Sequence, residues 1–286
     1  MDPEAFLEIA NQITRLQMYP FFELAHCLVT CICIKEDLAG GSHLFSRKNP
    51  FSCWITCMIA MYSGAILTSF LLGEPIISAY NNENSLILAI GAWYVIFYMP
   101  FDIGFRFFNF LPIKLVLAVM KEVIRCKKVH DGVIHAASIY PNSYLIMIVI
   151  GTLKGNGSAF LKILERLLRG LWTSNSFELM QMSITTKSCI AASVLFILSE
   201  KADIISAPDA LVYFGVITFF VYFKIETILF GIHDRFIPFE KLFCSIFFGG
   251  LWDRLEYLLI PAGKKSHIFV KKEVRDVKIE SMKKKK

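Results

Sequence analysis

Two long apolar segments constrain the fold most strongly. Residues 50–72 carry no formal charge, and residues 211–230 carry only Lys224 and Glu226. Because a helix of about 20 apolar residues crosses the hydrocarbon of a bilayer, each segment is long enough for one crossing. Hydrophobic residues make up 55% of the 286 residues, which is more apolar than an ordinary soluble domain. The sequence therefore predicts an all-α membrane protein.

Further apolar segments raise the predicted number of crossings to seven transmembrane helices. They are shorter than the first two or contain polar residues, so each is a weaker prediction taken alone. Their ranges are 18–34, 86–101, 111–139, 140–160 and 184–199.

Basic residues between these segments predict the orientation. One side of the membrane collects most Lys and Arg, namely Lys35, Arg47, Lys48, Arg106, Lys162, Arg166, Arg169 and the C-terminal tail. The other side has only Arg15 and Lys201. Since basic loops stay in the cytosol, we expect a lumenal or external N-terminus and a cytosolic C-terminus. The first 12 residues have no apolar core of the kind that a signal peptide needs.

Proline and glycine positions suggest an internal repeat. Gly64 lies as far after Pro50 as Gly155 lies after Pro141. An offset of about 91 residues would give two inverted three-helix repeats, the plan of many transport proteins. Chance spacing of these common residues is the alternative. The predicted organisation is a seven-span domain over 1–235, with repeat one at 16–108, repeat two at 111–203 and a seventh helix at 209–230, followed by a basic tail over 236–286.

The fourth segment carries an unusual stripe of cations. At about 100° per residue, five of its basic residues and one glycine fall within a sector of about 80°. The members of this stripe are Lys114, Lys121, Arg125, Lys128, Gly132 and His135. A cation in the middle of the bilayer costs about 2.5–3.5 kcal/mol on insertion scales, so the stripe must meet water, acids or phosphate rather than lipid chains.

Three interpretations of the stripe stay open from the residues alone. It marks a cytosolic amphipathic segment or snorkels to the interface, it binds an anionic lipid head group, or it lines an aqueous route for ions. In the second interpretation, Gly132 leaves room for close approach. The second and third are compatible with each other.

The fifth segment contains an unfavourable helical sequence, "GTLKGNG". Lys154, Gly155 and Gly157 lie inside an otherwise apolar crossing, and the second segment has the related pair Ser63 and Gly64. A break in a membrane helix is tolerated where its backbone is covered by protein or lines a wet cavity. We therefore expect two broken helices that meet and shape a pore; the alternative is that the glycines only allow close helix packing.

The residues that could form a catalytic or metal site do not occur in the combinations that such sites require. Cys53 and Cys57 lie one helical turn apart but without a nearby His or carboxylate. The pairs His130–Asp131 and His233–Asp234 lack further catalytic partners. We expect neither an enzyme nor a metal site, and we read the eight cysteines as small apolar residues.

Several ordered motifs resemble one family, the trimeric intracellular cation channels of endoplasmic and sarcoplasmic reticulum. The stripe stands here as Lys121-Glu122-Val123-x-Arg125-x-x-Lys128, and the resemblance covers about residues 20–238. The other motifs are "LLGEP" (71–75), "WYVIFYMPFD" (93–102), "LPIKL" (111–115), "KGNG" (154–157), "LLRGLW" (167–172) and "TTKS" (185–188).

The resemblance implies a homotrimer with one pore through each protomer. Potassium would be the main permeant ion, and its flux would balance charge when calcium-release channels empty the store. It also implies that Lys121 and Arg125 hold phosphatidylinositol 4,5-bisphosphate, with Lys128 and Gly132 on the same stripe. Lys187 of "TTKS" would be a further basic position in the membrane, with a gating or packing role.

The same resemblance places the protein in the reticulum membrane, which is continuous with the nuclear envelope, among membrane lipids and without nucleic acid. The terminal "KKKK" would fit a retrieval signal to that compartment or a solvated charge run. A secondary transporter with inverted repeats is the alternative function. The potassium-filter sequence TVGYG is absent, so we expect modest selectivity from a wide wet pore.

Overall fold

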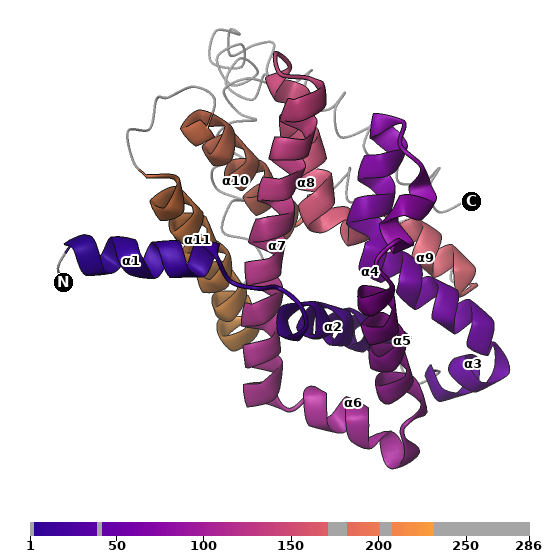
Figure 1. Ribbon diagram of the computed structural model, residues 1–286. Coiled ribbons are helices and arrows are strands. Elements are labelled where there is room, and N and C mark those ends of the chain that lie inside the picture. Colours follow the sequence, from indigo (N-terminus) through magenta and orange to yellow (C-terminus); the bar gives the residue numbers. More distant parts are fainter. Residues whose placement is uncertain (1–2, 39–41, 171–181, 201–207, 232–286) are drawn as a thin grey trace, which may run out of the picture. The chain divides into compact units, whose positions relative to one another are not determined.

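The computed structural model describes residues 3–38, 42–170, 182–200 and 208–231, and these residues form helices and turns without a strand (Figure 1). The predicted all-α fold is therefore confirmed for the described part of the chain. Its α-helices are α1 (Pro3–Thr14), α2 (Phe21–Asp37), α3 (Ser42–Lys48), α4 (Pro50–Leu72), α5 (Glu83–Tyr98), α6 (Ile103–Phe108), α7 (Leu111–Ile139), α8 (Tyr144–Phe160), α9 (Lys162–Leu168), α10 (Ile184–Glu200) and α11 (Asp209–Phe230), with short 3-10 helices η1 (Ile76–Tyr80) and η2 (Pro100–Asp102).

Residues at the helix ends explain several of these bounds. Pro50 opens α4, where its missing N–H leaves no intrahelical bond unmade. Gly73 and Gly231 follow α4 and α11 in the left-handed conformation, which glycine adopts without steric cost. The side chain of Asn82 accepts a hydrogen bond from the Ser85 N–H and so caps α5.

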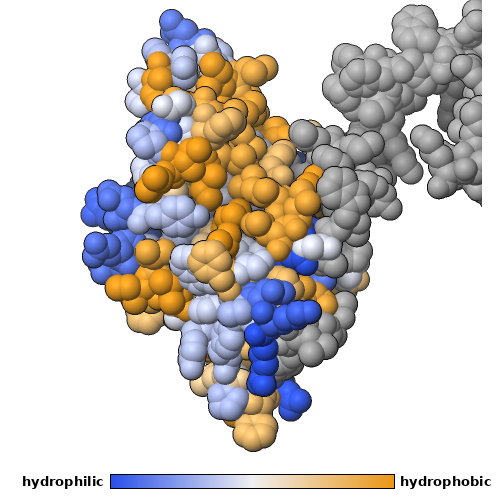
Figure 2. Space-filling view, turned by 90° about the vertical axis from the view of Figure 1, so that its right-hand side faces the viewer, coloured by the Kyte–Doolittle hydropathy of each residue, from blue (hydrophilic) through white to orange (hydrophobic). Residues whose placement is uncertain are grey.

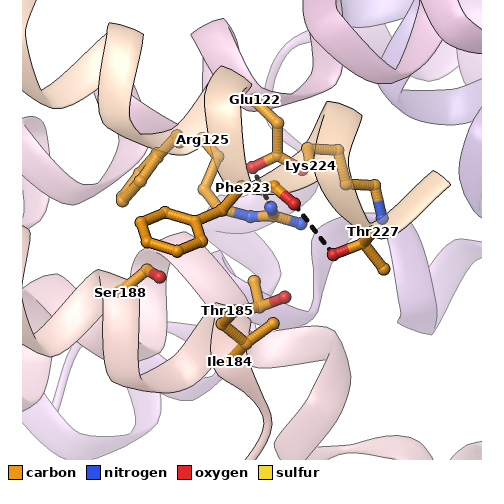
Figure 3. Close-up of a pocket in the computed structure, with 9 residues that line it drawn as sticks. Glu122, Arg125, Ile184, Thr185, Ser188, Phe223, Lys224 and Thr227 are labelled. Carbon is orange, nitrogen blue, oxygen red and sulfur yellow. Dashed lines mark hydrogen bonds and ion pairs between the residues drawn. The ribbon is translucent and has the colours of Figure 1, made fainter. Parts of the chain in front are cut away.

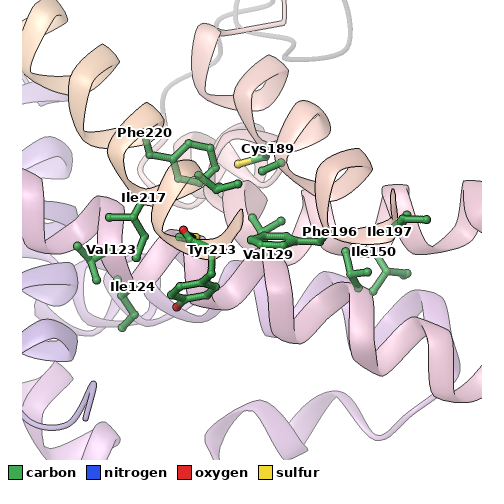
Figure 4. Close-up of a cluster of buried hydrophobic side chains, with 14 of the residues drawn as sticks. Val123, Ile124, Val129, Ile150, Cys189, Phe196, Ile197, Tyr213, Ile217 and Phe220 are labelled. Carbon is green, nitrogen blue, oxygen red and sulfur yellow. Dashed lines mark hydrogen bonds between the residues drawn. The ribbon is translucent and has the colours of Figure 1, made fainter. Parts of the chain in front are cut away.

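Two hydrophobic cores divide the helices into groups. The first core joins α2, α4 and α5 through residues such as Ile32, Cys57 and Ile96. The second joins α7, α8, α10 and α11, where Val129 and Phe196 lie among buried side chains (Figure 4). The helix α11 therefore belongs to the second of these groups.

Three helices meet the length and composition expected of a membrane span: α4, α11 and the continuous stretch formed by α8 and α9. A bent pair, α5 with the segment Pro100–Phe108, would make a fourth. The helices α2 and α10 have 17 residues each, and α7 has 29 residues but carries the basic stripe. The count of seven spans and the inverted repeat thus stay predictions.

The surface supports membrane insertion, because large apolar side chains point outward from these helices. Phe51 and Phe70 of α4 and Tyr94 of α5 are 69%, 65% and 59% exposed. In the view of Figure 2, hydrophobic side chains gather over the upper and middle part of the described face, and hydrophilic ones gather at its top, its left edge and its lower part.

One predicted segment has a different shape in the structure. Residues 86–101 were expected to form one straight crossing, but α5 ends at Tyr98 and the chain bends by 95° into α6. Phe101 and Asp102 take positive φ values of 55° and 56° at this bend. The tail over 236–286, with "KKKK", lies outside the described residues.

Candidate functional site

The centre of the helix assembly is a close crossing of α4 and α8 at two glycines. A Cβ atom added to Gly157 would lie 2.5 Å from Gly64 Cα, and one added to Gly64 would overlap the carbonyl of Lys154. Only glycine permits two helix backbones to approach this closely. The prediction that the two glycine-containing segments meet is therefore confirmed.

The same crossing corrects the prediction of two broken helices. The backbone of α8 leaves helical geometry at Asn156, with φ −132° and ψ 30°, whereas α4 is a continuous helix through Gly64. The Asn156 side chain donates a hydrogen bond of 2.7 Å to Thr186 Oγ1 on α10, which supports the break. The hydroxyl of Ser63 donates to Ala60 O of its own helix at 2.9 Å, so in this conformation it stabilises α4.

Other predicted glycine positions also lie at helix contacts. Gly132 of α7 faces Gly151 of α8, with 2.9 Å between a Cβ added to Gly132 and Gly151 Cα. Gly155 packs against Val129 of α7. The packing interpretation thus fits these positions, while the break itself is confined to the Asn156 region of α8.

One cavity has a volume of about 480 Å³, and we call it the Lys121 cavity. It lies among α2, α4, α7, α8, α9 and the start of α10, and its lining is rich in charge. Lys121 Nζ donates one hydrogen bond of 3.3 Å to Thr30 Oγ1. The charged and polar lining residues are Thr30, Glu36, Asp37, Lys121, Asn156, Ser158, Lys162, Glu165, Ser183 and Thr185.

A second cavity of about 230 Å³, the Lys128 cavity, lies at the next level along α2, α4, α7 and α8, and η1 and the start of α5 also line it. Lys128 Nζ lies 3.0 Å from His26 Nε2, and Lys154 forms part of the wall. Glu23 also lines it and accepts a hydrogen bond of 2.6 Å from Ser85 Oγ. The two cavities follow one another along the helices and flank the crossing of Gly64 with Gly157.

A third, smaller cavity of about 60 Å³ lies between α7, α10 and α11, and we call it the Arg125 cavity. Figure 3 shows Glu122 and Arg125 of α7 pointing toward Lys224 and Thr227 of α11. Arg125 Nη1 pairs with Glu122 Oε2, while Glu122 Oε1 is buried and accepts no hydrogen bond from the described residues. With two cations, Arg125 and Lys224, and one carboxylate, Glu122, the lining has a formal excess of one positive charge.

The stripe therefore distributes its cations over separate places. Lys121, Arg125 and Lys128 line three different cavities, although Thr185 belongs to both the Lys121 and the Arg125 cavity. Toward the ends of α7, Lys114 pairs with Glu36 and His135 Nε2 lies 2.8 Å from Glu74 Oε1. Lys187 is half-buried on α10 and lines none of the three cavities.

Sequence reasoning missed a set of ion pairs that involves two carboxylates of the Lys121 cavity, those of Asp37 and Glu165. Arg169 has a side-chain exposure of 0% and pairs with Asp37 at 2.9 Å and Glu165 at 2.6 Å. Arg166 also binds Asp37, at 2.6 Å. Burial alone would raise the pKa of Asp37, but the hydrogen bonds and charges of Arg166 and Arg169 outweigh it and hold that pKa below its usual value.

Comparison with known proteins agrees with this geometry. Residues 39–231 match the family model described as "TRIC channel". The chain is 43% identical over 259 residues to "Trimeric intracellular cation channel type 1B.1" of Caenorhabditis elegans, covering 91% of this chain and 88% of that protein. It is 36% identical over 248 residues to the rat protein "Trimeric intracellular cation channel type A", covering 86% and 82%.

Solved structures give the same result. A trimeric intracellular cation channel from C. elegans, solved in the absence of Ca²⁺, matches with a TM-score of 0.77 and 42% identity over 82% of this chain and 100% of that one. A second structure, described as "Structural basis for activity of TRIC counter-ion channels in calcium release", matches with a TM-score of 0.74 and 33% identity over 79% and 99%.

Proposed function

The chain belongs to the TRIC channel family of ion channels and is not an enzyme, and from this premise we propose that it conducts monovalent cations, chiefly potassium, across the endoplasmic or sarcoplasmic reticulum membrane. This current would balance charge while calcium leaves the store through its release channels. The description of one related structure as a counter-ion channel in calcium release supports this role.

The observation that carries the proposal is the pair of successive polar cavities between α2, α4, α7 and α8. The Lys121 cavity presents three carboxylates, Glu36, Asp37 and Glu165, to an entering cation. The same lining contains two lysines, Lys121 and Lys162, and the carboxylates are paired with Lys114, Arg166 and Arg169. Three carboxylates against two lysines leave the lining with a formal charge of −1, which favours a cation in the cavity. The route continues to the Lys128 cavity past the crossing of Gly64 with Gly157.

The basic stripe would regulate this route rather than select the ion. Lys121 and Lys128 each contribute an ammonium group to one of the two cavities, where a fixed positive charge opposes a permeating cation. We infer that the pathway conducts when these groups are displaced or neutralised. Lys154 and the break at Asn156 supply a segment of α8 that can adjust at the same level.

We further propose that phosphatidylinositol 4,5-bisphosphate modulates opening through the basic groups of α7. Arg125 and Lys224 line a cavity with excess positive charge, and phosphate oxygens are the acceptors that such groups bind best. Since the Arg125 cavity and the Lys121 cavity share Thr185, a head group held near Arg125 can influence the cavity that Lys121 lines.

The assembly that we propose is a homotrimer of seven-span protomers, arranged as two inverted three-helix halves plus α11. The word "trimeric" in the names of the relatives supports the oligomeric state. One core joins α2, α4 and α5, and the other joins α7, α8 and α10 with α11, a grouping that supports the two halves. The distribution of Lys and Arg supports a lumenal N-terminus and a cytosolic C-terminus.

Single-channel recording of the purified protein in a planar bilayer tests conduction. Discrete current steps in potassium solution are expected, and saturable flux coupled to a gradient without such steps would instead indicate a transporter.

A variant pair tests the lipid effect. In Lys121→Gln combined with Arg125→Gln, we expect weaker binding of phosphatidylinositol 4,5-bisphosphate and an altered open probability. Lys127→Gln is the control, because it removes one positive charge from α7 at a position outside the stripe. Unchanged lipid binding and unchanged currents in the double variant would contradict the proposed modulation. Thermal unfolding of each variant separates a binding defect from a folding defect.

A further inference from the structure

The bend between α5 and α6 is held by a buried lysine from another helix. Lys35 of α2 is 5% exposed, and its Nζ donates to Ile96 O at 2.7 Å and to Asp102 Oδ1 at 2.9 Å. The ring of Phe105 lies with its centroid 4.8 Å from the same Nζ. Lys35 therefore ties both sides of the bend to α2.

The backbone at the bend is strained, so its shape requires such support. Phe101 and Asp102 both have left-handed φ values, and a non-glycine residue in that region costs about 1–3 kcal/mol. Because buried contacts fix this strained conformation, the bend is a defined part of the fold. Its effect is to turn α6 by 95° away from the direction of α5.

The short helix α6 is apolar on both sides, which is unusual at a protein surface. Gly104 is buried, and Phe105 and Phe108 pack against the first core. On the opposite side, Ile103 and Phe107 are 53% and 56% exposed. Phe101 before the helix is 88% exposed and Phe110 after it is 61% exposed.

A single basic residue lies within this outward apolar surface. At about 100° per residue, Ile103, Arg106 and Phe107 fall within one sector of about 100° on α6. Arg106 is exposed and forms no ion pair with the part of the chain that the structure describes. We call Phe101, Ile103, Arg106, Phe107 and Phe110 the α6 surface.

Apolar side chains around one arginine match the interface of a bilayer better than water. Aromatic residues gather at the level of the lipid head groups. Basic groups there attract anionic lipids of the cytosolic leaflet by about 1 kcal/mol each. The α6 surface also adjoins two outward apolar residues, Met99 just after α5 and Leu111 at the start of α7, which are 40% and 56% exposed. Figure 1 shows α6 crossing the foot of the assembly, between the lower ends of α5 and α7.

We propose that the bend lays α6 flat in the cytosolic head-group layer, with Phe101, Ile103 and Phe107 inserted among the lipid chains and Arg106 on a lipid phosphate. The occupant of this surface is the bilayer itself. The α6 surface would thus anchor the α5–α7 connection at a fixed depth, immediately before the helix that carries the basic stripe. This anchoring goes beyond the proposed conduction and does not depend on it.

Quenching of an added tryptophan in the full-length protein tests the insertion. Phe107→Trp is reconstituted in phosphatidylcholine vesicles, and its emission is taken as the difference from the parent protein. We expect strong quenching by lipids brominated on their chains and little quenching by iodide in the water. Lys48→Trp, at an exposed polar position at the end of α3, is the control and should show the reverse pattern.

The two other outcomes overturn the proposal in different ways. Quenching of the Phe107→Trp emission by iodide alone would place the α6 surface in water. Quenching by neither agent would place it against another protein chain, such as a second subunit.

A charge variant tests the role of Arg106. In phosphatidylcholine vesicles that contain brominated phosphatidylserine, the Phe107→Trp probe reports the preference for the anionic lipid. Adding Arg106→Gln should weaken that preference by about fivefold, the equivalent of about 1 kcal/mol. Arg47→Gln is the control and should leave the preference unchanged. An equal preference with and without Arg106 would remove the anionic lipid from the proposal. Neither readout uses ion current, so both stand apart from the test of conduction.

Discussion

Two lysines from different helices point into the protein in contrasting surroundings. Lys35 of α2 binds a carbonyl oxygen at 2.7 Å and a carboxylate at 2.9 Å, and it is 5% exposed. Lys121 of α7 has one hydrogen bond of 3.3 Å, to Thr30, and lines a cavity of about 480 Å³. The ammonium group of Lys35 is surrounded by protein acceptors, whereas that of Lys121 faces a cavity that has space for water, ions or lipid phosphate.

This difference separates a structural charge from a functional one. A buried cation with short, complete contacts can stabilise one conformation, because losing its partners would leave charges unpaired. A cation with few contacts in a roomy cavity can change its surroundings at small cost, which a gate requires. The substitutions below test this separation, beginning with the largest expected effect on stability.

Replacement of Lys35 should destabilise the fold most. In Lys35→Met we expect a loss of about 3 kcal/mol in the free energy of unfolding, because the buried ion pair between Lys35 and Asp102 is lost at a strained bend. Chemical unfolding of the purified protein in detergent measures the change. Lys48→Met, at an exposed site, should have almost no effect. If Lys35→Met were as stable as the parent protein, Lys35 would not have the structural role that distinguishes it from Lys121.

The crossing between the two cavities should tolerate little added volume. Gly64→Ala places a methyl group against the Lys154 carbonyl, and we expect a loss of about 1–3 kcal/mol from overpacking. Gly91→Ala is the matched control, since a Cβ there meets no atom within 4 Å. The control should be neutral or gain up to about 1 kcal/mol from better helix propensity. Equal unfolding midpoints for the two variants would show that the α4–α8 crossing is looser than the structure describes.

The sequence was sufficient to predict the helices and the stripe because both depend on local periodicity. Residues 50–72 and 111–139 match α4 and α7 at both ends, and the break in "KGNG" lies in α8 as expected. The distribution of Lys121, Arg125 and Lys128 over three cavities could not be predicted, because it depends on which helices surround α7. A helix face specifies a direction, but the partner in that direction is set by tertiary packing.

Lys35 shows the same limit from the other side. In the sequence it is one of several basic residues after an apolar segment, and it contributed only to the predicted orientation. Its partners Ile96 and Asp102 lie far along the chain, at a bend that neither proline nor glycine spacing identified. Arg169 was likewise part of a recognisable motif, yet its burial against Asp37 and Glu165 has no local signal.

Replacement of Lys121 should change function more than stability. We expect Lys121→Met to alter the free energy of unfolding by less than about 1 kcal/mol, because the loss of one long hydrogen bond from the ammonium group to Thr30 is offset by no longer burying a charge. Removing its positive charge from the Lys121 cavity should raise cation current or open probability, since the cation then meets less repulsion. Bilayer recording and chemical unfolding of the same preparation provide both numbers. A large loss of stability with unchanged currents would show that Lys121, like Lys35, has a structural role, and the two lysines would then not differ in function.

The smallest expected effect is the loss of stability in acid that comes from protonation of the paired carboxylate of Asp37. Its pKa lies below the usual value, so its ion pairs stabilise the fold above the unfolded-state pKa of about 3.9 and that contribution is lost as pH falls through the lower, folded-state value. We expect the unfolding midpoint to be independent of this group from neutral pH to about pH 5 and to fall only in stronger acid. Asp37→Asn should be less stable at neutral pH and should lose part of the acid dependence, whereas Glu36→Gln, at an exposed ion pair, should retain it. An acid profile identical in Asp37→Asn and the parent protein would show that Arg166 and Arg169 do not stabilise the charged form of Asp37. In that case, Asp37 would be held by its surroundings as weakly as Lys121 is.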